Sequence, residues 1–156
     1  MKEMFPPEKC PKCNADKDGE MRQVEIKFDH WPDTALFPNK AGNTMHWAQR
    51  AKLRQACRHE AYLHGMVNDL VEPMKHATIE ILVTAKDNRK RDLDGFASAV
   101  KSWIDGIVDA RILEDDNYFV VPEITIKFVG VGEESVTIII KEIEYGLLNN
   151  KERRKA

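Results

Sequence analysis

Hydrophobic and polar positions alternate along several stretches of this 156-residue chain with the period of a β-strand. In residues 22–29, RQVEIKFD, apolar side chains occupy every second position, a pattern typical of a half-buried strand. Three later segments are rich in β-branched residues and predict strands at residues 77–85, 124–131 and 135–143. The last two are predicted to pair as a hairpin through residues 132–134, which contain a glycine.

Two other segments follow the period of a helix. The first, residues 45–64, is predicted to begin after a cap at Asn43 or Thr44 and to end at Gly65. Its apolar positions, with the arginines mostly on the other side, are Trp47, Ala51, Leu53, Ala56 and Leu63. The second helix begins at Asp92 or Asp94. Its apolar positions should face the sheet, and they are Phe96, Val100, Trp103, Ile104 and Ile107. The order β-α-β-α-β-β predicts an α+β fold, in which two main helices pack on a mixed β-sheet.

The length is typical of one domain with a core of its own. Residues 1–20 are Pro-rich and charged, lack periodicity, and contain Cys10 and Cys13 in a C-x2-C motif. We therefore expect a flexible N-terminal appendage at 1–20, the main domain at 21–148, and a basic C-terminal tail at 149–156.

The composition, 42% hydrophobic and 32% charged, is ordinary for a globular protein. No apolar run approaches the roughly 18 residues that span a bilayer, so no membrane association is expected. The N-terminus lacks the apolar segment of a signal peptide, which indicates the cytoplasm. Three unevenly spaced cysteines do not form a disulfide framework, which agrees with a reducing compartment.

The net charge of −2 gives no support for binding a polyanion, but the basic residues are clustered. Taken alone, each cluster is typical of a solvated face. The alternative is contact with a nucleic acid backbone, for which the candidates are Lys86, Arg89, Lys90, Arg91, Arg50 and Arg54.

A polar stripe lies opposite the apolar side of the second helix. Its members, Asp94, Ser98, Lys101 and Asp105, are spaced four, three and four residues apart, so they share one face. The simplest interpretation is a solvated face. An N-terminal aspartate is favoured by the helix dipole, and Lys101 and Asp105 form an i,i+4 ion pair.

Further acidic residues suggest a second interpretation. Asp92 and Asp94, two residues apart at a loop–helix junction, can direct both carboxylates to one point. Residues 114–116, Glu-Asp-Asp, follow the helix after Ile112 and Leu113, whose burial should draw this segment against the core. Carboxylates that converge at neutral pH need a cation, and ligands that are all oxygen favour Mg²⁺ or Mn²⁺. Such sites commonly also bind substrate phosphate, which indicates phosphodiester chemistry.

These motifs resemble the RusA family of phage and prophage Holliday junction resolvases. The resemblance covers about residues 22–145 and rests on Arg91-Asp92-Leu93-Asp94, Lys101, Asp105-Gly106-Ile107 and Asp115-Asp116. Upstream, Phe37-Pro38-Asn39-Lys40 and Met45-His46-Trp47 also match. The resemblance implies a Mg²⁺-dependent, structure-selective endonuclease that resolves four-way DNA junctions by paired phosphodiester cleavage, as a homodimer.

The resemblance also implies roles for individual residues. Asp92, Asp94 and Asp116 would be catalytic and hold the divalent ion, and Asp115 would assist them. Lys101 would neutralise charge on the phosphate or on the leaving oxygen. The interval from Asp94 to Lys101 is about one turn longer than the family pattern, which leaves Ser98 as a rival for that place. Arg89, Lys90 and Arg91 would contact the duplex backbone.

One departure from the family pattern and one pair of aromatic residues leave alternatives open. Gly95 stands where family members commonly have asparagine, so a catalytically inactive RusA-like module that binds DNA or a partner is the alternative function. His46 and Trp47 would stack on an exposed base, or Trp47 would fill the core.

The C-x2-C motif supplies half of a structural zinc site. The missing ligands would be Cys57 and His59, or the same cysteine pair from a second subunit. A zinc-dependent adaptor is therefore a third function, and a tail without metal is the alternative to any zinc site.

Overall fold

The computed structural model describes residues 21–38 and 45–144. The predicted appendage at 1–20, with Cys10 and Cys13, and the predicted tail at 149–156 lie outside these residues. Four strands are present: β1 (Gln23–Phe28), β2 (Ala77–Ala85), β3 (Glu123–Val131) and β4 (Ser135–Glu142). The helices are α1 (Trp47–Met66) and α2 (Leu93–Asp109), with a 3₁₀ turn η1 (Thr34–Leu36). The predicted order of elements and the α+β class are confirmed.

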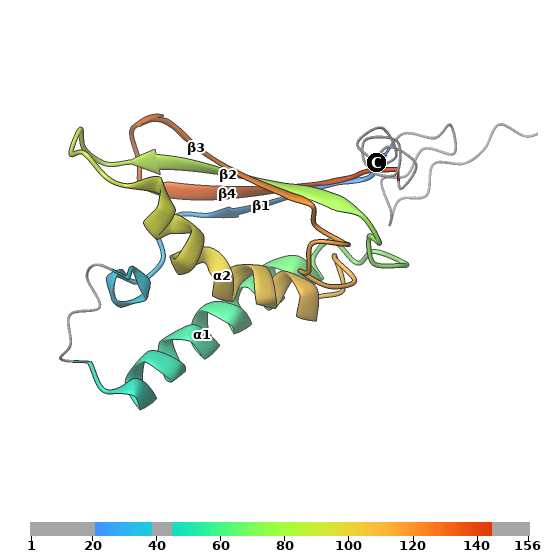
Figure 1. Cartoon of the computed structure of the whole chain (residues 1–156), viewed down its shortest axis with the longest axis horizontal. Helices are drawn as coiled ribbons and strands as arrows, with labels where there is room; N and C mark the ends of the chain where they lie inside the picture. The colour runs from blue at the N-terminus through green and yellow to red at the C-terminus, as the bar shows by residue number, and fades with distance from the viewer. Residues whose placement is uncertain (1–20, 39–44, 145–156) are drawn as a thin grey trace, which may run out of the picture.

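The strands form one mixed sheet in the order β1-β4-β2-β3, and both helices lie on one face of it (Figure 1). β4 pairs antiparallel with both β1 and β2, whereas β2 and β3 are parallel and connected through α2. A parallel pair needs a crossover of this kind, which places the start of α2 just beyond the end of β2. This junction carries Asp92 and Asp94.

The predicted hairpin of the last two strands is wrong. β3 and β4 are consecutive in the chain, but β2 lies between them. Residues 132–134 therefore cross the end of β2, and the backbone N–H of Gly132 donates to the carbonyl of Ala85 at 2.8 Å. Alternate residues of β2 are buried and the rest are half-buried, which agrees with a strand that has a neighbour on each side.

The amphipathic pattern of α2 is confirmed. The five predicted inward residues, Phe96, Val100, Trp103, Ile104 and Ile107, are all buried against the sheet. The stacked rings of Phe28 and Trp103, with centroids 3.9 Å apart, join β1 to α2. Ile112 and Leu113 are also buried, as predicted, and backbone hydrogen bonds to Met74 hold the segment after α2.

The predicted apolar face of α1 is wrong at four of its five positions, and only Leu53 is half-buried. Trp47 is 76% exposed and Leu63 is also exposed, while the inward positions are Leu53, Cys57 and Ala61. In Figure 1, α1 crosses α2, and its N-terminal end is the part furthest from the sheet. Trp47 therefore has no core within reach, which excludes the interpretation that it fills the core.

The predicted ends of α1 also differ from the observed ones. The N-cap is His46, whose Nδ1 accepts from the Ala48 N–H at 3.2 Å, and the alternatives Asn43 and Thr44 lie outside the described residues. Gly65 does not end the helix but is buried inside its last turn. A Cβ on Gly65 would lie 2.5 Å from the Cβ of Ala110, so this glycine permits close packing.

Glu60 joins three elements of the fold. One carboxylate oxygen accepts from the indole N–H of Trp103 at 3.1 Å, and the other lies 2.7 Å from Nε2 of His30. A hydrogen bond with the Trp31 carbonyl is the main cause that raises the pKa of His30; burial opposes it, and Glu60 raises it further. The end of β1 is thus tied to both helices through charge.

Candidate functional site

The N-terminus of α2 presents Asp92 and Asp94 to solvent. Asp92 is the N-cap residue, but its side chain makes no capping hydrogen bond. Asp94 lies in the first turn, where one carboxylate oxygen accepts from the N–H of Gly95 at 2.8 Å. Both side chains are exposed, so most of their oxygen lone pairs point toward solvent. The N-terminal dipole of α2 favours their negative charge.

The loop before α2 is held in shape by Asp87. Its carboxylate accepts from the N–H of Arg89 at 3.0 Å and pairs with the Arg91 guanidinium at 2.7 Å. These two contacts, in that order, lower the pKa of Asp87. The Arg91 guanidinium also lies 4.8 Å from the ring centre of Trp31, a cation–π contact, so Arg91 is anchored to the domain.

The other predicted cations of this loop point outward. Arg89 is almost fully exposed, although its Nε lies 3.6 Å from Asp87. Lys86 is exposed and lies 3.8 Å from Glu134. Within the described part of the chain, Lys90 has no ion-pair partner. Arg89, Lys90 and Lys86 are therefore placed to meet an external anion, whereas Arg91 is occupied within the fold.

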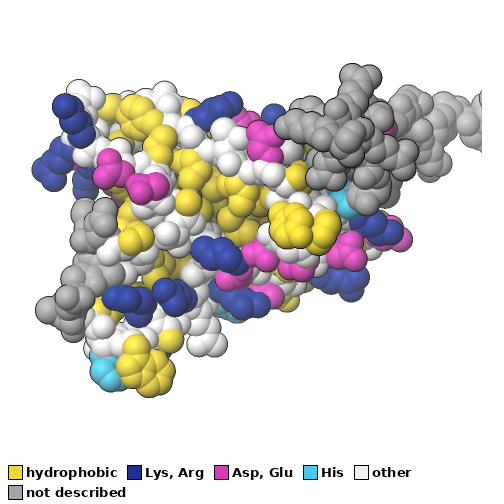
Figure 2. Space-filling view, viewed as in Figure 1, with side chains coloured by type: hydrophobic (Ala, Val, Ile, Leu, Met, Phe, Trp, Pro, Cys, Tyr) yellow, Lys and Arg dark blue, Asp and Glu magenta, His cyan; other side chains and the backbone are white. Residues whose placement is uncertain are grey.

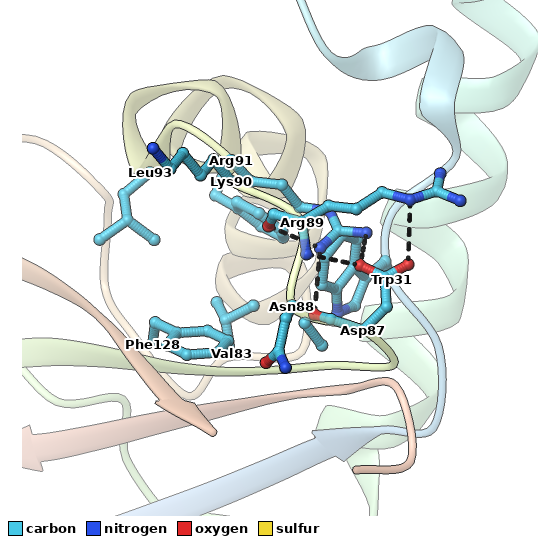
Figure 3. Close-up of a pocket in the computed structure, with 11 residues that line it drawn as sticks. Trp31, Val83, Asp87, Asn88, Arg89, Lys90, Arg91, Leu93 and Phe128 are labelled. Carbon is cyan, nitrogen blue, oxygen red and sulfur yellow. Dashed lines mark hydrogen bonds and ion pairs between the residues drawn. The ribbon is translucent and has the colours of Figure 1, made fainter. Parts of the chain in front are cut away.

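A cavity of about 310 Å³ lies beneath this loop (Figure 3). Val83 and Phe128 come from the sheet, Leu93 from the start of α2, and Trp31 from the segment after β1. A second cavity of about 340 Å³ is lined by Asp92, Gly95 and the Arg89–Arg91 segment. The predicted site thus borders two hollows with aromatic and basic walls.

Asp116 lies on the return segment after α2, away from the N-terminus of that helix. The return segment brings its carboxylate to the ammonium of Lys101, which also pairs with Asp105. Partial burial lowers the pKa of Lys101, but the hydrogen bonds to Asp105 and Asp116 raise it more, so the lysine is firmly cationic. The i,i+4 pair of the simpler interpretation is therefore present, and Asp116 is added to it.

The predicted acidic residues form two groups in this structure. Asp94 and Lys101 are seven residues apart on α2, which corresponds to a rise of roughly 10 Å. Among the described residues, no three His, Cys, Asp or Glu side chains are gathered so that they could hold a metal ion. Ser98, the rival of Lys101, is exposed on the turn between the two groups.

The carboxylates at the start of α2 have the chemistry that Mg²⁺ requires. This ion is usually held by one or two carboxylates together with waters and substrate phosphates. Asp92 and Asp94 supply that number from exposed, largely unused oxygens. Asp116 would have to leave Lys101 in order to join them.

Asp115 is committed to its own turn. Its carboxylate accepts from the N–H of Asp116 at 2.7 Å and from the amide of Asn117 at 2.5 Å. These hydrogen bonds, the first being the larger cause, lower the pKa of Asp115. The residue shapes the turn that presents Asp116.

The residues of α1 that were predicted to bind DNA differ in exposure. Arg54 is exposed, whereas Arg50 is half-buried. His46 and Trp47 stand exposed at the N-terminus of the helix, with ring centroids 5.5 Å apart. Their position is compatible with the predicted stacking on a base.

Cys57 and His59 do not converge on a common ligand. They are two residues apart on α1, and such side chains point in different directions. Cys57 packs against the core, while His59 is exposed and stacks with Tyr62. Burial, and then the nearby Glu60 and Asp33, raise the pKa of the Cys57 thiol, which disfavours the thiolate that zinc needs.

Sequence reasoning missed Trp31 and Asp87, which shape the loop. Trp31 donates its indole N–H to the carbonyl of Thr84 at 2.8 Å and supports Arg91. A tryptophan directly after a strand, and an aspartate four residues before an arginine, were the available signals. Neither indicates a contact between segments more than fifty residues apart.

No family model matches the chain, and no curated protein matches it. Within the described residues, neither helix is long and apolar enough to cross a membrane.

Proposed function

We propose that this protein is a Mg²⁺- or Mn²⁺-dependent endonuclease that cuts four-way DNA junctions. One observation supports the proposal above all: the exposed carboxylates of Asp92 and Asp94 directly follow an exposed basic loop. Cations on a surface bind the phosphate backbone through charge, without reading sequence. Carboxylates beside them hold the hard divalent ion that phosphodiester cleavage uses. The two sets of charge would thus act on the same phosphate.

In this proposal Asp92 and Asp94 hold the ion, Asp116 becomes a third ligand after it releases Lys101, and Asp115 supports the turn that carries it. The ion, when bound, would polarise the scissile phosphate and lower the pKa of an attacking water. Lys101, whose pKa lies above its ordinary value, remains charged at neutral pH and neutralises an oxygen of the phosphate or of the leaving group. Arg89, Lys90, Lys86 and Arg54 bind the DNA backbone.

The test is cleavage of a synthetic four-way junction with Mg²⁺ or Mn²⁺. Asp92→Asn, Asp94→Asn and Asp116→Asn should each abolish cleavage. Each should leave junction binding in EDTA unchanged or tighter, because a charge that repels phosphate is removed. The matched control is Asp69→Asn, at an exposed residue with φ of 39°, a conformation that asparagine tolerates. Wild-type rates in all three variants would refute the acidic site.

Two further variants test the assignment within α2. Lys101→Ala should slow the chemical step while binding persists, and Ser98→Ala should have the smaller effect. The reverse ranking would assign the role to the residue one turn nearer to Asp94.

A non-catalytic module is the second candidate function. The ion pairs of Lys101 with Asp105 and Asp116 favour it, because they leave both the lysine and the third carboxylate already neutralised. Selective binding of junctions without cleavage under any divalent metal would support this alternative.

The proposed DNA substrate also bears on the oligomeric state of the protein and on its place in the cell. A four-way junction has approximate two-fold symmetry and is resolved by paired cuts, so we propose a homodimer as the active form. A DNA substrate is consistent with action in the cytoplasm.

A further inference from the structure

The edge strand β3 has an uncovered face. Its register with β2 places Ile124, Ile126 and Phe128 on the side of the sheet that carries the helices. Yet Ile124 is 47% and Phe128 is 52% exposed. On the opposite edge, the corresponding row of β1 is at most 4% exposed. The helices therefore cover the β1 side of the sheet and leave the β3 side open.

The exposed surface also extends to the segment just before the strand. Tyr118 and Phe119, just before β3, are 74% and 65% exposed, and their rings lie 4.3 Å apart. Figure 2 shows hydrophobic atoms gathered over β3 and the segment before it, in the orientation of Figure 1. We call this surface the β3 strip, and it consists of Tyr118, Phe119, Ile124, Phe128, Val129 and Val131. It holds six of the thirteen exposed large hydrophobic residues described, a concentration typical of an interaction site.

The backbone of β3 offers a second means of attachment. β3 ends the sheet of the described residues, so its outer edge has unused N–H and carbonyl groups. Sheet edges that bear exposed apolar side chains tend to pair with another strand. The sequence of β3 indicates which strand can pair with this edge.

We propose that the β3 strip is the surface on which a second copy of this chain docks, by antiparallel pairing of β3 with β3. In such a pair, two-fold symmetric about Thr125, Glu123 of one copy stands opposite Lys127 of the other. Both side chains lie on the open face of the sheet, where Lys127 reaches Glu80 at 2.5 Å and Thr125 reaches Glu123 at 3.1 Å. Opposite charges face each other twice across the axis.

The apolar positions are complementary in the same register. Antiparallel pairing sets the start of one strand against the end of the other, so Tyr118 and Phe119 of one copy approach Val129 and Val131 of the other. The three exposed aromatic rings alone offer roughly 350 Å² of surface. This is nearly half of the roughly 800 Å² that each partner buries in a standard interface.

The pairing has a geometric consequence for the proposed function, which it deepens by naming the dimer surface. A two-fold axis that relates neighbouring strands of one sheet is perpendicular to the sheet, so both helical layers lie on the same side. Leu93, between Asp92 and Asp94, lines a cavity together with Phe128 of the strip. The acidic residues of both copies would therefore face one side, as paired cuts on one junction require.

The test measures the mass of the full chain in solution without DNA, by light scattering or sedimentation. The wild type should be a dimer. Ile124→Lys should be a monomer, whereas Val67→Lys, at an exposed valine after α1, should remain a dimer. Glu123→Lys and Lys127→Glu should each be monomeric alone, because like charges then meet twice. Mixed together they should form a heterodimer, because every opposed pair is then Lys against Glu.

The outcomes separate the interface from the nuclease. A monomeric wild type, or a dimer that Ile124→Lys leaves intact, overturns the interface. Single charge variants that stay dimeric, or that fail to combine on mixing, overturn the register. A dimer with the expected behaviour that cuts no junction refutes the endonuclease while the interface stands. A wild-type monomer that cuts junctions would refute the interface and leave the endonuclease standing.

Discussion

The contact between the helices predicts opposite effects for the same substitution at two glycines of α2. At Gly106 a Cβ would lie 2.1 Å from the carbonyl oxygen of Arg58 and 2.8 Å from the Cβ of Ala61. The oxygen belongs to the backbone of α1, so it cannot turn aside as a flexible side chain would. At Gly95 the nearest atom is a ring carbon of Phe37, at 3.4 Å, which is ordinary contact.

The magnitude of the effect follows from these distances. Overpacking costs about 1–3 kcal/mol, and a contact with backbone belongs at the upper end of that range. The higher helix propensity of alanine offsets roughly 0.5–1 kcal/mol. Gly106→Ala should therefore destabilise the domain by about 2 kcal/mol and lower its Tm by roughly 4–8 °C. Gly95→Ala should instead raise the Tm by roughly 1–3 °C.

Thermal unfolding of the two variants and the wild type, in one buffer, checks this prediction. If Gly106→Ala melts at or above the wild-type temperature, the close crossing of α1 and α2 is wrong. A large loss of stability in Gly95→Ala would show that the first turn of α2 is packed more tightly than the structure has it. If Gly95→Ala keeps or raises the Tm, packing at position 95 tolerates a residue larger than glycine. Asparagine is the residue that the RusA-like pattern has at this position.

Three predictions concern charge. The folded-state pKa of His30 lies above the ordinary 6.5, so its interactions stabilise the fold fully below that pH and are lost as the pH rises through the folded value. His30→Gln should thus lower the Tm more at pH 6 than at pH 8.5, and an equal loss at both would contradict the assignment. The double variant Arg89→Ser/Lys90→Ser should flatten the salt dependence of DNA binding by about one or two units without changing the Tm. Arg91→Ser should lower the Tm by contrast, because Arg91 pairs with Asp87 and lies over Trp31; unchanged melting would mean that the loop does not need it.

The local pattern of the chain was sufficient for α2 and for the existence of the strands. The apolar positions of α2 recur at the helical period and are all buried against the sheet. One apolar face therefore predicted both that the segment is a helix and which side of it faces the sheet. In α1 the same reasoning failed, because that helix packs mainly on α2 and meets the sheet only in part, as where His64 stacks on Phe28. Its fully buried residues are the small Ala61 and Gly65, and a glycine in sequence predicts a helix end.

The sequence by itself determined the α+β class, the amphipathic second helix, and the presence of two acidic groups around it. Only the tertiary structure decided that β2 separates β3 from β4, because strand neighbours are chosen by long-range burial and not by the turn between them. Only the tertiary structure paired Asp116 with Lys101 and left Asp92 and Asp94 exposed beside the basic loop. Those positions depend on how far the return segment reaches along α2, and that is determined by the docking of Ile112 and Leu113 beside Met74.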